Sequence, residues 1–291
     1  MVWGGTRLPE WKGLPLQDHI GESWEVSTYP SFPSIIANGP LAGTALEEAL
    51  GFPLPLLVKF IDSRQDLSVQ VHPNDEMASR KHHCLGKSEM WYVLDAKPGA
   101  FLYSGFSRSI TPEQFKQRVH DGTITEVLAK HQVHPGDVFY IPAGRVHTIG
   151  AGILLAEIQQ TSDITYRIYD YNRPGLDGKP RQLHTELAAE ALDYRVYDNY
   201  RTLWQNQGSV SNCLTTPFFT VNHISATQPL RLNRNERNSF VILSALKGNC
   251  QVVAGGQTIT LTEANSCFLA SHLADYQIIP GTAVELLETY L

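Results

Sequence analysis

The sequence predicts an all-β protein with a few helical additions, and three observations support this prediction. Most of the 291-residue chain reads as short strands separated by glycine and proline turns, a pattern typical of β-sandwiches and barrels. The region after residue 212 carries almost no helical signal. Apolar residues make up 42% of the chain and charged residues 18%, which is the composition of a packed globular core rather than of a disordered chain.

The strand predictions rest on short apolar or alternating runs that end at turn residues. In the first part of the chain the expected strands are 67–72, 89–94, 137–142, 153–159 and 165–171. In the last part they are 240–248, 249–261 and 266–271.

Besides a short helix expected between the capping box at Thr44 and a stop at Gly51, two helices are expected among these strands. Thr111 and Gln114 form a capping box with Pro112 at the first helical position, which predicts a helical stretch from 111 to about 130. Residues 181–193 have apolar residues at helical spacing and predict a second helix. Its apolar face is expected to carry Leu183, Leu187 and Ala191.

The chain is expected to form two related β domains. The polar segment 195–212 suggests a boundary, so we predict domains at 1–208 and 209–291. A weak internal repeat supports this division, because 136–147 can be aligned with 264–275. The apolar pattern is kept in the alignment, but Asp275 takes the place of His147. Two unrelated strands of similar apolarity would give the same pattern.

Charge and composition exclude several functions. The formal net charge of −6 argues against a nucleic-acid-binding protein, which normally shows a basic face. The N-terminal residues lack the regions of a signal peptide, and no apolar run is long enough to cross a bilayer. Four cysteines in a chain of this length do not suggest a disulfide framework. We therefore expect a soluble cytoplasmic protein with free thiols.

The segment 136–147 is the most specific motif in the chain. It reads G-x5-P-x-G-x2-H, with Pro142 and Gly144 in a tight turn that precedes His147. It resembles the second motif of the cupin superfamily, in which the histidine is usually a metal ligand. The resemblance implies a jelly-roll barrel with His147 pointing inward.

A second histidine ends the strand predicted at 67–72. Alternation along that strand places Ser68, Gln70 and His72 on one face. A surface strand would show the same polar face. The first cupin motif normally supplies H-x-H and a glutamate a few residues later, whereas this chain has Gln70-x-His72 and a glutamate, Glu89, 17 residues on.

That departure is typical of one family. The runs LSVQVHPND (67–75), GKSEMWYVL (86–94), GDVFYIPAGRVHTIGAG (136–152) and EIQQTSDITYRIYDY (157–171) resemble the short bacterial form of type I phosphomannose isomerases. The segments WGGTRLP (3–9), GESWEVS (21–27) and PRQLHTELAAEAL (180–192) fit the same family. The resemblance implies a catalytic cupin barrel followed by a smaller cupin-like domain that has lost its metal.

The resemblance also implies a metal site with one Zn²⁺ per chain. Its ligands fall on Gln70, His72, Glu89 and His147. Two imidazoles and a carboxylate suit zinc, and an amide oxygen is a weak fourth ligand. The same two histidines and carboxylate could hold iron(II) in an oxygenase.

The resemblance also implies residues that act in catalysis and substrate binding. The resemblance places Glu157, Lys87 and Arg167 in the active site, with Glu157 as the base that moves a proton between C1 and C2 of the sugar. Lys59, Lys87 and Arg167 are the implied substrate-binding residues, although Lys59 could equally be an edge-strand lysine. Asp163 is expected only to support the site. Lys87 precedes Glu89 by two residues, so both side chains share a face of an extended strand.

The implied activity is the zinc-dependent interconversion of mannose 6-phosphate and fructose 6-phosphate through an enediol. The expected partner is a small sugar phosphate, with no nucleic acid and no membrane, and the chain is expected to be a monomer or homodimer. Two alternatives remain open, namely a non-enzymatic sugar-sensing cupin and an iron-dependent cupin oxygenase.

Overall fold

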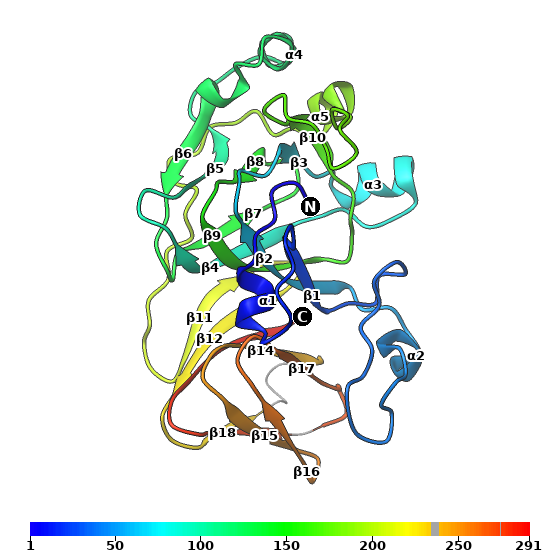
Figure 1. Ribbon diagram of the computed structural model, residues 1–291, viewed down its shortest axis with the longest axis vertical. Helices are drawn as coiled ribbons and strands as arrows, with labels where there is room; N and C mark the ends of the chain where they lie inside the picture. The colour runs from blue at the N-terminus through cyan, green and yellow to red at the C-terminus, as the bar shows by residue number, and fades with distance from the viewer. Residues whose placement is uncertain (234–238, 274) are drawn as a thin grey trace.

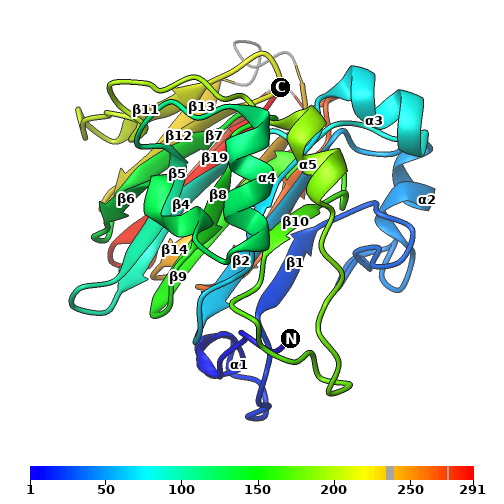
Figure 2. The ribbon, with the colours of Figure 1, turned by 90° about the horizontal axis from the view of Figure 1, so that it is seen from above.

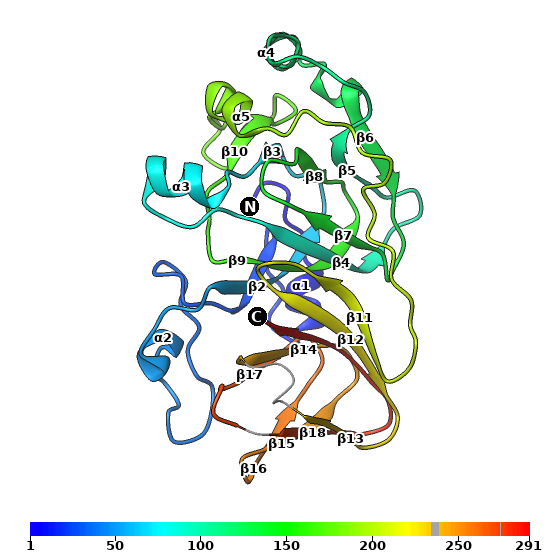
Figure 3. The same cartoon turned by 180° about the vertical axis from the view of Figure 1, so that it is seen from behind.

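The computed structural model describes residues 1–233, 239–273 and 275–291. Four antiparallel sheets are stacked along the long axis of the molecule (Figures 1 and 3). The first sheet has the order β1 (Glu22–Val26), β2 (Leu56–Ser63), β9 (Ile153–Gln160), β4 (Glu89–Ala96), β7 (Val138–Ile141). The second has the order β10 (Tyr166–Tyr169), β3 (Val69–Val71), β8 (His147–Ile149), β5 (Phe101–Phe106), β6 (Leu128–Gln132). These two sheets face each other and form the first barrel.

The last part of the chain builds the second barrel. Its first sheet has the order β11 (Val210–Thr215), β12 (Thr220–Ala226), β19 (Val284–Tyr290), β14 (Val241–Lys247), β17 (Ser266–Leu269). Its other sheet has the order β13 (Leu230–Asn233), β18 (Asp275–Pro280), β15 (Cys250–Ala254), β16 (Gln257–Leu261). The all-β prediction is confirmed, and every predicted strand segment contains a strand.

Alternating side chains give the first sheet two different faces. Val58 and Phe60 of β2 pack in a core cluster that also contains Phe219 and Ile242 of the second barrel. Ile61 points the other way, into a cluster inside the first barrel. Lys59 is on this inner face as well, where it pairs with Glu157 of β9. The polar side chains of the first sheet are therefore directed into the first barrel.

The internal repeat is visible in the strand pairing. β7 pairs with β4 so that Trp91 lies opposite Phe139, and β17 pairs with β14 so that Leu243 lies opposite Cys267. The strand orders of the two barrels correspond in the same way, with β8 and β18 in matching places. Asp275, which begins β18, therefore occupies the place of His147, as the alignment predicts. The domain boundary at 208/209 stays a prediction.

The same correspondence pairs two glutamates. Glu157 lies opposite Trp91 in the first barrel, and Glu288 lies opposite Leu243 in the second. Both carboxylates are buried. In the second barrel the carboxylate accepts hydrogen bonds from Asn222 and Tyr276.

Helices cover the outside of the second sheet (Figure 2). α4 (Pro112–His120) begins at the predicted capping box, in which the Thr111 hydroxyl accepts from the Gln114 backbone N–H. The prediction that helix continues to about 130 is wrong. Gly122 has φ +70°, a short 3₁₀ turn η1 (Ile124–Val127) follows, and residues 128–132 pair with β5 as strand β6. Sheet pairing has overridden the local helical pattern.

The second predicted helix is shorter than expected, because α5 spans only Thr185–Ala191. His184, the residue before α5, lies beside β10, because the His184 backbone N–H donates to the Arg167 carbonyl at 2.8 Å. Leu183 thus lies outside the helix and is exposed, while Ala188 is the helical residue that is fully buried. The prediction that Leu183, Leu187 and Ala191 share the apolar face of one helix is therefore wrong for Leu183.

The remaining helices are short: α1 (Arg7–Trp11), α2 (Leu46–Leu50) and α3 (Asp75–His82). The cysteines Cys84, Cys213, Cys250 and Cys267 are free thiols. Within the described residues, no helix has the length and apolarity that a bilayer crossing requires. The cytoplasmic location, the oligomeric state and the lack of a nucleic-acid partner stay predictions.

Candidate metal and substrate site

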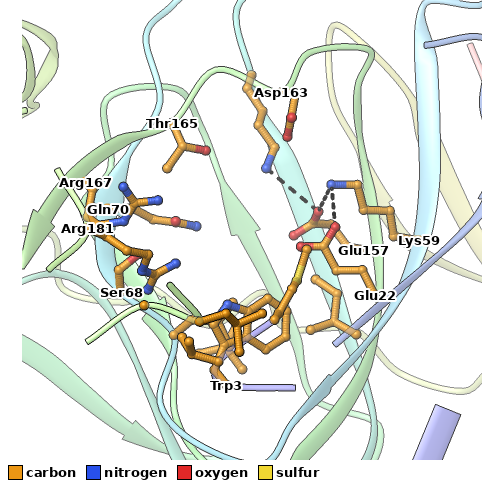
Figure 4. Close-up of a pocket in the computed structure, with 18 of the residues that line it drawn as sticks. Trp3, Glu22, Lys59, Ser68, Gln70, Glu157, Asp163, Thr165, Arg167 and Arg181 are labelled. Carbon is orange, nitrogen blue, oxygen red and sulfur yellow. Dashed lines mark ion pairs between the residues drawn. The ribbon is translucent and has the colours of Figure 1, made fainter. Parts of the chain in front are cut away.

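A cavity of about 600 Å³ opens into one end of the first barrel (Figure 4). Both sheets of the barrel contribute to it, as does the N-terminal segment. Its lining residues include Trp3, Glu22, Lys59, Ser68, Gln70, Lys87, Glu157, Asp163, Thr165, Arg167 and Arg181. A cavity of this size with several convergent polar groups is typical of a small-molecule site.

Three candidate metal ligands come together beside this cavity. Ligand atoms of His72, Glu89 and His147 all lie within 4.8 Å of one another, and each side chain is buried. Glu89 Oε2 is 3.5 Å from His72 Nε2, and Glu89 Oε1 is 3.4 Å from His147 Nε2. Among the residues that the structure describes, this is the one such cluster of three.

Backbone carbonyls fix the orientation of both imidazoles. His72 Nδ1 lies 2.8 Å from the Ile164 carbonyl, and His147 Nδ1 lies 2.8 Å from the Arg145 carbonyl. Each Nδ1 therefore carries the proton, and each Nε2 lone pair is directed into the cluster. Burial and the nearby Lys87 lower the pKa of His72, and burial lowers that of His147 to about 3. Both imidazoles are neutral at pH 7, the form that binds a metal.

The cluster fits a metal ion. His72 Nε2 is buried and has no hydrogen-bond partner within the described part of the chain. Such an unpaired buried group requires an explanation, and a cation held between the two Nε2 atoms and the Glu89 carboxylate supplies one. The donor set of two nitrogens and one carboxylate suits zinc or iron(II).

Gln70 lies next to this cluster. Its partner across the β3–β8 pair is His147, and its amide Nε2 is 3.2 Å from His147 Nε2. The amide oxygen is the group that would bind a metal, which requires the opposite orientation of the amide. The position of Gln70 agrees with the predicted fourth ligand, and its role stays a prediction.

A row of alternating charges leads from the cluster along the inner face of the first sheet. Lys87 Nζ is 2.8 Å from Glu89 Oε2 and 3.8 Å from Glu157 Oε1. Lys59 Nζ is 3.7 Å from Glu157 Oε1 and 3.4 Å from Glu22 Oε2. Both lysines are buried. Burial alone would lower the pKa of Lys87, but Glu157 and Glu89 raise it above its ordinary value, so its ammonium stays charged.

Glu157 is the centre of this row. Its Oε2 accepts a hydrogen bond from Trp91 Nε1 at 3.0 Å, and its Oε1 faces both lysines. Burial alone would raise the pKa of Glu157, but Lys87 and Lys59 outweigh it and lower the pKa. Glu157 is therefore ionised at neutral pH and available as a proton acceptor, although as a weaker base than an unpaired buried carboxylate.

Arg167 lies on the opposite wall of the cavity. It pairs with Gln70 across β10 and β3, so it faces the cavity close to the metal cluster. Its Nη1 donates to the Gln182 carbonyl at 3.0 Å, while its Nε is buried without a partner among the described residues. Burial and the nearby Arg181 lower the pKa of Arg167. Five of the predicted site residues therefore line one cavity, namely Lys59, Gln70, Lys87, Glu157 and Arg167, and the other three form the buried cluster beside it.

Other lining residues were not predicted to take part. Glu22 lines the cavity and pairs with Lys59 at 3.4 Å. Asp163 lines the cavity rather than lying behind it. The sequence pattern places Arg181 in the predicted helix 181–193, but in the structure it precedes α5, in a loop that lines the cavity.

Sequence comparison gives a consistent set of relatives. Residues 3–100 match the model of the type I phosphomannose isomerase catalytic domain. The chain is 32% identical to mannose-6-phosphate isomerase ManA of Bacillus subtilis (strain 168), over 95% of this chain and 92% of that protein. It is also 32% identical to a mannose-6-phosphate isomerase of Streptococcus mutans, over 95% of this chain and 91% of that protein.

Solved structures agree with these relatives. The mannose 6-phosphate isomerase of Bacillus subtilis superposes with a TM-score of 0.90 at 28% identity, covering 100% of this chain and 96% of that chain. A mannose 6-phosphate isomerase solved with zinc bound shares the fold, with a TM-score of 0.78 at 16% identity over 100% of this chain and 96% of that chain. The predicted fold class, a cupin-type barrel followed by a second cupin-like β domain, is confirmed.

Proposed function

The chain belongs to the type I phosphomannose isomerase family. We therefore propose that it interconverts mannose 6-phosphate and fructose 6-phosphate. One observation carries the proposal. The buried cluster of His72, Glu89 and His147 lies beside a cavity of about 600 Å³ that also contains the Glu157 carboxylate and the Arg167 guanidinium. Metal ligands, a base and a cation are groups that can carry out an aldose–ketose isomerisation.

We propose that Gln70, His72, Glu89 and His147 hold one zinc ion per chain. When bound, this metal would act as a Lewis acid that stabilises negative charge developing on sugar oxygens. Lys87 contributes from outside the ligand set, because its ammonium at 2.8 Å from Glu89 favours the ionised carboxylate that a metal requires.

The remaining steps fall to side chains of the cavity. Glu157 removes the proton at C2 of the open-chain aldose while O1 gains a proton, which gives the enediol. Glu157 then returns a proton to C1 while the O2 hydroxyl loses its proton, which gives the ketose. Trp91 and the two lysines hold its carboxylate in place, so its direction is fixed before substrate binds. Arg167, on the facing wall, stabilises the negative charge of the enediolate or holds the substrate.

A coupled assay tests the proposed function directly. The protein is mixed with mannose 6-phosphate, and fructose 6-phosphate is detected by its onward conversion with auxiliary enzymes. We expect turnover in air and under argon alike. Binding of mannose 6-phosphate without turnover would favour a sugar sensor, and turnover only in the presence of oxygen would favour an iron-dependent oxygenase.

The cations of the cavity predict a preference for the phosphorylated sugar. Two charge-assisted contacts, each contributing about 1.5–3 kcal/mol, would favour mannose 6-phosphate over mannose by a factor of hundreds or more in kcat/KM. The ratio of the two kcat/KM values measures this preference. Equal values for mannose and mannose 6-phosphate would show that the cavity recognises the free sugar.

A further inference from the structure

Two arginines bind one carboxylate at the mouth of the cavity, and a third arginine, Arg167, lies near them. Asp170 is only 5% exposed and accepts hydrogen bonds from two of them. Its Oδ1 accepts from Arg173 Nη2 at 2.8 Å and from Arg181 Nη2 at 2.5 Å, while its Oδ2 accepts from Arg181 Nε at 2.6 Å. Arg167 is close enough that Arg181 and Arg173 lower its pKa. This part of the cavity rim therefore carries more positive than negative charge.

These contacts close a loop over the cavity. The loop, residues 173–181, begins and ends with the two arginines that Asp170 holds. Pro174 bridges to Pro180, and the Gly175 backbone N–H donates to the Lys179 carbonyl at 2.7 Å. Gly175, Leu176 and Asp177 of the loop line the cavity. Asp170 thus fixes both ends of a segment that forms part of the cavity wall.

The two arginines differ in what they face. Arg181 lines the cavity beside Arg167 (Figure 4), whereas Arg173 is not among the lining residues. The cations deeper in the cavity are less available, because Lys59 and Lys87 each lie within 4 Å of two carboxylates. Asp170 carries one negative charge against the two arginines that it binds, and Arg167 forms no ion pair with a carboxylate among the described residues. An anion entering the cavity would therefore find an excess of positive charge on the side of Arg181 and Arg167.

We propose that Asp170 is a positioning residue that holds the Arg181 guanidinium where it binds the phosphate of the substrate. This inference rests on the proposed function. Gln70 lies beside the metal cluster, Arg167 pairs with Gln70, and Arg181 lies beside Arg167. With the phosphate at Arg181, the other end of an open-chain hexose, which carries C1 and C2, extends toward the metal cluster.

The test uses Asp170→Asn, Arg181→Gln and the double variant. Asp170→Asn keeps the size of the side chain but removes the charge that holds Arg181. Each single variant should raise the KM for mannose 6-phosphate about tenfold or more, with kcat changed by less than about threefold, because the loss is in substrate binding. The double variant should be no worse than Arg181→Gln alone, since Asp170 acts through Arg181. Asp170→Glu should restore most of the affinity.

A matched control is Glu190→Gln. Glu190 also bridges two cations, Arg80 and Lys81, but lies on the surface away from the cavity mouth. Its substitution should leave KM unchanged. An unchanged KM in Arg181→Gln, a fall in kcat alone in Asp170→Asn, or additive effects in the double variant would overturn the inference. If Asp170→Asn does not fold, Arg181→Gln and Asp170→Glu decide the question.

Inorganic phosphate separates this inference from the proposed function. If the wild-type protein does not convert mannose 6-phosphate, the proposed function fails, but phosphate binding can still be measured by thermal denaturation. The inference predicts that phosphate raises the Tm of the wild-type protein and of Glu190→Gln, and that this shift is lost in Arg181→Gln. Absence of any shift in the wild-type protein would contradict it.

Discussion

Replacing Glu157 by glutamine is expected to lower kcat for mannose 6-phosphate by about 10²–10⁴-fold, the usual contribution of a positioned general base. Glutamine keeps the size of the side chain and can still accept a hydrogen bond from Trp91, but it cannot remove a proton. Metal content should not change. The measurement combines steady-state turnover with exchange of the C2 proton for solvent deuterium.

The second barrel offers a matched control for this experiment. Glu288 is a buried carboxylate at the position that corresponds to Glu157, but it pairs with Asn222 and Tyr276 instead of facing a cavity with lysines. Glu288→Gln should lower the Tm while leaving kcat within about threefold of wild type. If Glu157→Gln exchanges the C2 proton at the wild-type rate, Glu157 is not the base.

Replacing His147 by alanine is expected to abolish both metal binding and turnover. The variant loses one of three clustered ligands, so the bound metal should fall from about one equivalent per chain to well below it. Because a Lewis acid contributes several kcal/mol to stabilising charge in the transition state, kcat/KM should fall by about 10³-fold or more.

The control for this variant is His120→Ala, because the side chain of His120 is 84% exposed and pairs with the neighbouring Asp121. It should keep both metal and activity. Elemental analysis of the purified proteins gives the metal content. Two tightly bound metals per wild-type chain would contradict the prediction of one site, and full activity in a metal-free His147→Ala would exclude a metal-dependent reaction.

Strand alternation and the turn motif, both short-range features of the sequence, are enough to predict much of the site. Gln70 and His72 alternate on one strand, and Lys87 and Glu89 are two residues apart, so each pair was expected to share a face. The Pro142–Gly144 turn was expected to present His147 inward, and His147 does lie in the buried cluster. These predictions succeeded because strand periodicity and turn chemistry are local properties.

The failures involve contacts between distant segments. Residues 128–132 look helical in isolation, but the free edge of β5 pairs with them as a strand. Residues 181–184 look helical as well, but the Arg181–Asp170 ion pair and the hydrogen bond from His184 to Arg167 hold them in the cavity wall. Arg181 was missed for the same reason, since its position depends on a carboxylate 11 residues away that no periodicity connects to it.

The electrostatics of the site could not be predicted from residue type either. Lys59 and Lys87 were expected to be available for substrate, but the structure places each of them between two carboxylates. Their positive charge lowers the pKa of Glu157. It only partly opposes burial and the charge of Glu157, which together raise the pKa of Glu89 to about 7. Pairing of this kind depends on which strands are neighbours in the sheet, and here β2, β9 and β4 bring the lysines and glutamates together.

We propose above all that isomerisation of mannose 6-phosphate requires a metal held by His72, Glu89 and His147. The most direct measurement is to remove the metal with a chelator, add Zn²⁺ back in steps under argon, and follow the formation of fructose 6-phosphate. We expect no activity in the metal-free protein and a linear recovery that ends at about one equivalent of zinc per chain. Full activity without metal, or recovery only with iron(II) and oxygen, would contradict it.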